Sequence, residues 1–196
     1  MIAVADKIME SYALALKLPI DWFKPLTRKP IVLVRLAHYP SPDHDLGDDQ
    51  MSCGAHTDQF GVTLLAQQDG VCGLQVKNSD GEWIDAVPVP GTLVINIGDL
   101  IERWSNGHFK ATEHRVIMRK GLERYSAIVF HMPDYHSTID CCIKDEKPKY
   151  IPIIAGDFLL KRESVYYGPS NEWVGHEENI LNTEQYFKTI LNSEQI

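Results

Sequence analysis

The spacing of apolar residues is helical at the start of the chain. Over residues 4–18 apolar side chains recur every four positions, which places them on one stripe of a helix. The stripe comprises Ile8, Tyr12 and Leu16, with Met9 and Ala13 beside it. Pro19 should end this helix, because the residue before a proline avoids the α region. The pattern predicts a packing helix that carries no chemistry of its own.

After residue 30 the apolar runs become short, rich in β-branched residues and bounded by turn residues. Runs of this kind, with no long helix between them, are typical of an antiparallel sandwich or barrel. An acidic stretch with proline and glycine, residues 41–50, predicts a loop. The predicted strands cover residues 31–36, 62–65, 73–76, 82–86, 92–97, 114–118 and 125–130.

The chain shows neither an internal repeat nor a break in composition. Helical segments are expected over residues 100–104, 158–166 and 183–191. We therefore expect a single domain over residues 1–196 that is mainly β with flanking helices. It would consist of a helix at 4–18, a β core at about 30–132 and a C-terminal helical tail.

Composition and charge exclude several classes of partner. The net charge of −8 and the pI near 5.4 argue against nucleic acid, because phosphate binding needs a basic surface. No apolar run approaches the length of a membrane span, and the first residues lack the basic region of a secretory signal. The four cysteines form no C-x-x-C pair, which favours reduced thiols. We expect a cytoplasmic protein without nucleic-acid or membrane partners.

The candidate chemistry starts at His56-Thr57-Asp58. In an extended segment, residues two apart point to the same face, so the imidazole of His56 and the carboxylate of Asp58 would lie side by side. Two histidines and one carboxylate with open positions are the ligand set of non-haem Fe(II) oxygenases. A lone H-x-D motif arises readily by chance, so this interpretation needs a third ligand.

His114 is the third ligand that the pattern favours. It opens a strand-like run, and the 58 positions between it and His56 (114 − 56) leave room for several hairpins to bring the two together. The competing pair, His131 and His136, flanks a segment with a proline. Histidines of loops are more often solvated than bound to a metal.

A second motif is suited to an anion. Arg124 and Ser126 alternate on a predicted strand and would therefore share a face. A guanidinium offers a planar fork of donors that matches a carboxylate, and burying it without an anion is unfavourable. The anion is either a carboxylate of the protein or a bound small acid.

Taken together, these motifs resemble the isopenicillin N synthase-like family of Fe(II)/2-oxoglutarate-dependent dioxygenases. They follow the family's order and approximate spacing, from the first helix to about residue 167. The matching pieces are Ala37-His38-Tyr39-Pro40, His56-Thr57-Asp58, Leu64-Leu65, Gly73-Leu74-Gln75-Val76, Val94-Ile95-Asn96-Ile97-Gly98-Asp99, Trp104-Ser105-Asn106-Gly107, His114-Arg115-Val116 and Arg124-Tyr125-Ser126.

The resemblance implies a double-stranded β-helix (jelly-roll) core with Fe(II) on His56, Asp58 and His114. It implies 2-oxoglutarate as co-substrate, dioxygen as oxidant and ascorbate as a supporting reductant. The distal carboxylate of 2-oxoglutarate would meet Arg124 and Ser126, with a hydroxyl from Tyr39. In relatives, positions matching Phe130 and Asn96 line the substrate pocket and lie near the iron, respectively.

The activity implied is oxidation of a C–H bond of a small organic substrate, by hydroxylation, desaturation or ring closure, as 2-oxoglutarate is decarboxylated to succinate. Two alternatives remain: an Fe(II) oxidase of the same fold that does not use 2-oxoglutarate, and a jelly roll that binds metal with impaired catalysis.

Two departures from the family stand out. Ala37 replaces an asparagine common in plant relatives, and the part before the first helix is short, which favours homo-oligomers through uncovered sheet surface.

Overall fold

The computed structural model describes residues 1–44 and 51–166, with side chains up to residue 161. The chain divides into two units, Met1–Ala155 and Gly156–Ile196, so the predicted single domain over residues 1–196 stays a prediction. The elements are α1 (Ile2–Ala15), η1 (Lys24–Thr27), β1 (Ile31–Tyr39), β2 (Cys53–His56), β3 (Val62–Gln67), β4 (Leu74–Lys77), β5 (Trp83–Asp85), β6 (Val94–Ile97), α2 (Asp99–Trp104), β7 (His114–Val116), β8 (Arg124–Met132), β9 (Thr138–Ile139), β10 (Ile153–Ile154) and α3 (Ala155–Tyr166).

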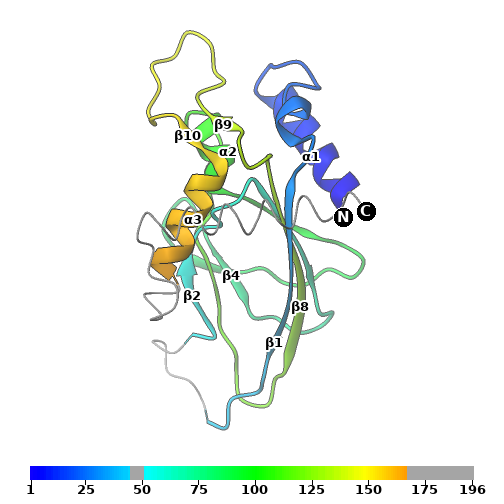
Figure 1. Cartoon of the computed structure of the whole chain (residues 1–196). Helices are drawn as coiled ribbons and strands as arrows, with labels where there is room; N and C mark the ends of the chain where they lie inside the picture. Colours follow the sequence, from blue (N-terminus) through cyan, green and yellow to red (C-terminus); the bar gives the residue numbers. More distant parts are fainter. Residues whose placement is uncertain (45–50, 167–196) are drawn as a thin grey trace. The chain divides into compact units, whose positions relative to one another are not determined.

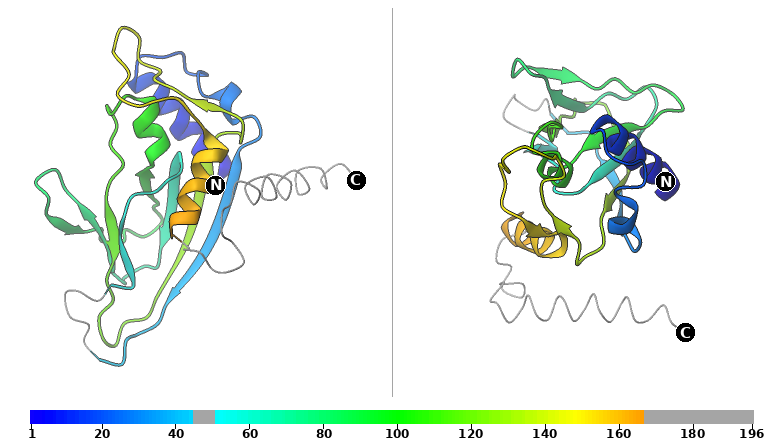
Figure 2. Two further views of the ribbon diagram at one scale, coloured as in Figure 1. Left: turned by 60° about the vertical axis from the view of Figure 1, so that its left-hand side comes forward. Right: turned by 90° about the horizontal axis from the view of Figure 1, so that it is seen from above.

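The first unit is built on two four-stranded antiparallel sheets. The strand orders are β1-β8-β3-β6 and β2-β7-β4-β5, so the chain passes repeatedly from one sheet to the other. The long strands β1 and β8 run side by side through the β core (Figures 1 and 2). This arrangement confirms the predicted antiparallel sandwich, and every predicted strand is present.

The core between the sheets is apolar and lies beside the region where the predicted site residues meet. Its buried members come from both sheets and from the turn after β7: Leu65, Leu74, Val116 and Met118. Each is almost completely removed from water, which is the main stabilising contribution in a sandwich of this kind. This packing holds the two sheets in place on either side of the site.

The first helix is shorter than predicted. It ends at Ala15 rather than at residue 18, because Lys17 adopts a left-handed conformation (φ 59°) and closes the helix before Pro19 is reached. Its fully buried stripe is Ala5, Met9 and Ala13, and the predicted stripe beside it is half-buried. Tyr12 packs against Phe109, with 5.0 Å between the ring centroids.

The other helical predictions fare differently. The turn expected over residues 100–104 is α2, and the helix expected over 158–166 is α3, which begins three residues earlier. The helix expected over 183–191 and most of the loop expected over 41–50 lie outside the described residues. The pair of two-residue strands β9 and β10 is a feature that the hydrophobic pattern did not predict. None of the described helices is both long enough and apolar enough to cross a membrane.

Candidate metal centre and anion site

Three predicted ligands converge on one point between the sheets. His56 ends β2, His114 begins the neighbouring strand β7, and the two residues face each other in the register. Asp58 follows two residues after β2, and one of its carboxylate oxygens lies 3.7 Å from His114 Nε2. One ligand atom from each of the three residues lies within 4.8 Å of the others. Because β2 stops at His56, the loop before β3, rather than strand alternation, brings Asp58 to the histidines.

Backbone carbonyls orient both imidazoles. His56 Nδ1 lies 2.8 Å from the carbonyl oxygen of Gly54, and His114 Nδ1 lies 3.0 Å from that of Thr112. In each ring the Nδ1–H group donates a hydrogen bond to a carbonyl oxygen. The lone pair of the neutral ring then lies on Nε2, where it can bind a cation. Such outer hydrogen bonds fix ring orientation and tautomer in metal sites.

The carboxylate of Asp58 is held in place by Asn96. The Asn96 side-chain amide donates to Asp58 Oδ2 over 3.2 Å, and both residues are buried. The turn that carries Asp58 packs against Gly98, where a Cβ would lie 2.0 Å from the carbonyl oxygen of Phe60. Only glycine permits this close approach. Asn96 therefore lies near the site, as expected, and its contact is with Asp58.

His56 is strongly basic in the absence of a cation. The pKa of His56 is raised to about 9, and the largest cause is the hydrogen bond between the Cys53 thiol and Nδ1, with 3.9 Å between sulfur and nitrogen. The Gly54 carbonyl and Asp58 contribute to this rise, whereas burial opposes it. A metal ion must displace this proton, because imidazole binds metals only in its neutral form.

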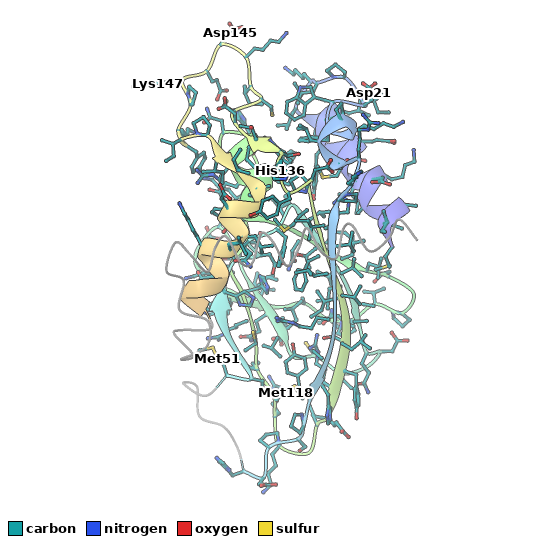
Figure 3. All side chains as sticks on the ribbon, in the orientation of Figure 1. Asp21, Met51, Met118, His136, Asp145 and Lys147 are labelled. Carbon is teal, nitrogen blue, oxygen red and sulfur yellow. The ribbon has the colours of Figure 1, made fainter. Side chains whose placement is uncertain are left out.

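The two competing histidines lie elsewhere. His131 is buried on the strand face toward α1, with its Nε2 4.0 Å from Asp6 Oδ1, and burial lowers its pKa. Figure 3 shows His136 well above Met51 and Met118, which flank the paired strands β2 and β7. Within the described residues, neither histidine joins a group that could hold a metal ion.

Arg124 and Ser126 form a buried site with spare hydrogen-bonding capacity. The Arg124 side chain donates from Nη2 to Gln67 Oε1 over 3.1 Å, and its guanidinium lies 5.0 Å from the centroid of the Tyr39 ring. Arg124 Nε and Nη1 and Ser126 Oγ are buried and have no partner among the described residues. Arg124 forms no ion pair with any described residue. The anion that it is suited to bind is therefore better explained as a small acid than as a carboxylate of the protein.

One pocket joins the two sites. It is lined by the three predicted metal ligands, by Asn96, by Tyr39, Arg124 and Ser126, and by Phe130. Phe130 is stacked on Phe60, with 4.3 Å between the ring centroids. Three residues of the pocket region were not predicted from the sequence: Gln67, which supports Arg124, and the lining residues Arg35 and Thr63. Alternation along β1 back from Tyr39 is a signal by which Arg35 could have been found.

The comparisons with known proteins agree with this geometry. The profile of the 2OG-Fe(II) oxygenase superfamily matches residues 30–133, which include all the site residues named above. The chain belongs to the 2OG-Fe(II) oxygenase superfamily. A homoarginine-6-hydroxylase of Oryza sativa subsp. japonica is 38% identical over 172 residues, covering 81% of this chain and 51% of the relative. A 2-oxoglutarate-Fe(II) type oxidoreductase of Emericella nidulans is 39% identical, covering 84% of this chain and 49% of the relative.

Solved structures of the superfamily also share the fold. The crystal structure of a full-length Neurospora crassa protein in complex with alpha-KG and thymine has a TM-score of 0.76 and 32% identity, and the match covers 83% of this chain and 53% of that one. The double-stranded β-helix implied by the family resemblance is thereby confirmed. The chain spans about half the length of the curated relatives it matches.

The residues present fit the groups that the superfamily uses. Two imidazole nitrogens and one carboxylate that lie close together and line a pocket suit Fe(II). The buried donors of Arg124 and Ser126 suit a carboxylate.

Proposed function

We propose that the chain is an Fe(II)- and 2-oxoglutarate-dependent oxygenase that oxidises a C–H bond of a small organic substrate. His56, Asp58 and His114 hold the iron. Arg124 and Ser126 bind the distal carboxylate of 2-oxoglutarate, and Tyr39 lies against the guanidinium and contributes its hydroxyl. Phe130 contributes to the wall that faces the substrate.

One observation carries the proposal. Two N–H groups of Arg124 and the hydroxyl of Ser126 are buried without partners among the described residues, in the same pocket as a potential metal site. Unpartnered buried donors are unfavourable by about 1–3 kcal/mol each. A molecule that brings a carboxylate to Arg124 and a chelating group to the metal satisfies both ends of the pocket, and 2-oxoglutarate has this form.

The protein's own contribution is binding, orientation and exclusion of water. The Gly54 and Thr112 carbonyls keep the imidazoles in the metal-binding tautomer, and Asn96 keeps one oxygen of Asp58 engaged so that the other faces the metal. Bound Fe(II) supplies the activation of dioxygen, with decarboxylation of 2-oxoglutarate to succinate and oxidation of the substrate.

The proposal is tested by mixing the protein anaerobically with Fe(II), ascorbate and 2-oxoglutarate, admitting oxygen, and measuring succinate and oxygen uptake. We expect slow succinate formation even without a primary substrate, and none for Asp58→Ala. Oxygen uptake without succinate would support an oxidase that does not use 2-oxoglutarate. Fe(II) binding without either product would support the impaired metal-binding protein.

The primary substrate is proposed to be a small molecule. L-homoarginine is the first compound to test, because the relatives with 38–40% identity include homoarginine-6-hydroxylases. The acidic charge supports the absence of a nucleic-acid partner, and the four free thiols support a cytoplasmic location.

We further propose that the chain forms homo-oligomers through β1. This strand is an edge of its sheet, and Val34 and Leu36 on it are 68% and 80% exposed. An edge strand with exposed apolar side chains is a template for pairing with another chain. Light scattering after size exclusion should give a multiple of the chain mass for the wild type and a lower mass for Leu36→Lys. A wild type that is monomeric at all concentrations contradicts this proposal.

A further inference from the structure

A second cationic group faces the pocket. Arg35 lies four residues before Tyr39 on β1, so the two side chains share a face of the strand, and both line the pocket. Arg35 pairs in register with Ile128, whereas Tyr39 pairs with Arg124. Four residues of strand place Arg35 and Tyr39 about 13 Å apart along β1. Arg35 therefore lies at a different level of the pocket from the proposed site for 2-oxoglutarate.

An aromatic wall accompanies Arg35. Its guanidinium lies 5.8 Å from the centroid of the Phe130 ring. Phe130 is also stacked on Phe60, so the Phe130 ring is fixed in place and still lines the pocket. A guanidinium beside a fixed ring offers a place for a flat group that carries negative charge.

The third feature is a buried hydroxyl. Thr63 is 2% exposed, and its Oγ1 has no partner among the described residues. Its cross-strand neighbours are Phe130 on β8 and Asn96 on β6, and all three line the pocket. Asn96 holds the carboxylate of Asp58, so the hydroxyl of Thr63 lies next to the proposed metal site. An unpartnered hydroxyl at this depth is unfavourable unless a ligand or water meets it.

We infer that Arg35, Thr63 and Phe130 bind the primary substrate, and that this substrate has a carboxylate or another anionic group beside a flat or apolar portion. The inference rests on the proposed function, in which Arg124 is occupied by 2-oxoglutarate and Arg35 is left to recognise the second molecule. Arg35 is exposed as well as lining the pocket, and so meets a ligand that arrives from solvent. A guanidinium has five N–H donors, so Arg35 binds an anion while keeping contacts with its neighbours.

The test uses the full chain loaded with Mn(II) and saturating 2-oxoglutarate, which blocks the Arg124 site and prevents turnover. Melting temperature is measured with two pairs of probes, phenylacetate against phenylacetamide and benzoate against benzamide. We expect each anion to raise the melting temperature more than its neutral amide. Arg35→Gln should abolish the difference, whereas Arg119→Gln, an exposed arginine outside the pocket lining, should keep it.

Thr63 supplies an independent readout. Thr63→Val removes the buried hydroxyl at nearly constant volume, so the ligand-free protein should melt about 2–4 °C higher. The same variant should bind the anionic probes more weakly, whereas Thr63→Ser should retain their binding. A structural role alone would not give higher stability together with weaker probe binding.

Two results would overturn the inference: equal shifts for anions and amides in the wild type, or an anion preference that Arg35→Gln leaves unchanged. The shift produced by 2-oxoglutarate alone reports separately on the proposed function. If that shift is absent while the anion preference depends on Arg35, the proposed function fails and the anion site stands.

Discussion

Replacing Arg124 by methionine separates binding of the co-substrate from stability of the fold. In the structure its guanidinium has two buried donors without partners among the described residues and one hydrogen bond, to Gln67. Two hydrogen bonds to a carboxylate contribute about 1.5–3 kcal/mol each, or about 3–6 kcal/mol together. At 1.4 kcal/mol for each factor of ten, Arg124→Met should weaken 2-oxoglutarate binding roughly 100- to 20,000-fold.

The same substitution should leave the ligand-free protein as stable as the wild type or more stable. It removes two unpartnered buried donors, and the loss of the Gln67 hydrogen bond, about 1 kcal/mol, acts in the opposite direction. Calorimetric titration of the Mn(II)-loaded protein with 2-oxoglutarate measures affinity, and thermal unfolding measures stability. Arg115→Met is the matched control, because that guanidinium lies 4.3 Å from the Trp83 ring centroid, outside the pocket lining. An affinity within threefold of the wild type in Arg124→Met would refute the anion site.

Two further substitutions test the support around the site. Asn96→Ala should weaken Mn(II) binding about 10- to 100-fold with the fold retained, because Asp58 loses its hydrogen-bond donor. The control for the titration is Asn78→Ala, in a surface turn. The Glu102 carboxylate accepts hydrogen bonds from the Ala111 N–H and the Tyr150 hydroxyl. Burial raises the pKa of Glu102, but these hydrogen bonds and the nearby Lys110 outweigh this effect and lower the pKa below the ordinary 4.5. A lowered pKa stabilises the fold above about pH 4.5, and this contribution is lost as the pH falls further. Glu102→Gln should therefore melt below the wild type at pH 7, with a smaller difference at pH 4; an equal difference at both would contradict this.

The sequence was sufficient to find residues whose side-chain chemistry is distinctive. The convergence of His56, Asp58 and His114 could be predicted because few residue types bind Fe(II) and hairpin spacing brings the two histidines together, although the loop after β2, rather than strand alternation, places Asp58. Arg124 and Ser126 were found in the same way, by alternation along one strand. These predictions needed only local geometry and the expectation of an antiparallel sandwich.

Residues whose role depends on strand register could not be found in this way. Thr63 is ordinary in sequence, and it matters because β3 lies between β8 and β6, which places its hydroxyl beside Phe130 and Asn96. Gln67 meets Arg124 for the same reason. The end of α1 was misjudged because a left-handed Lys17, with no glycine to mark it, closes the helix before the proline. Register and left-handed backbone arise from the packing of the whole unit.

The central claim is that His56, Asp58 and His114 together hold one divalent metal ion. The most direct measurement is a titration with Mn(II), in which the electron paramagnetic resonance signal of the free ion reports what remains unbound. We expect one Mn(II) per wild-type chain and no saturable site in either Asp58→Ala or His114→Ala, with both variants folded. One Mn(II) bound per chain at wild-type affinity in both variants would contradict it.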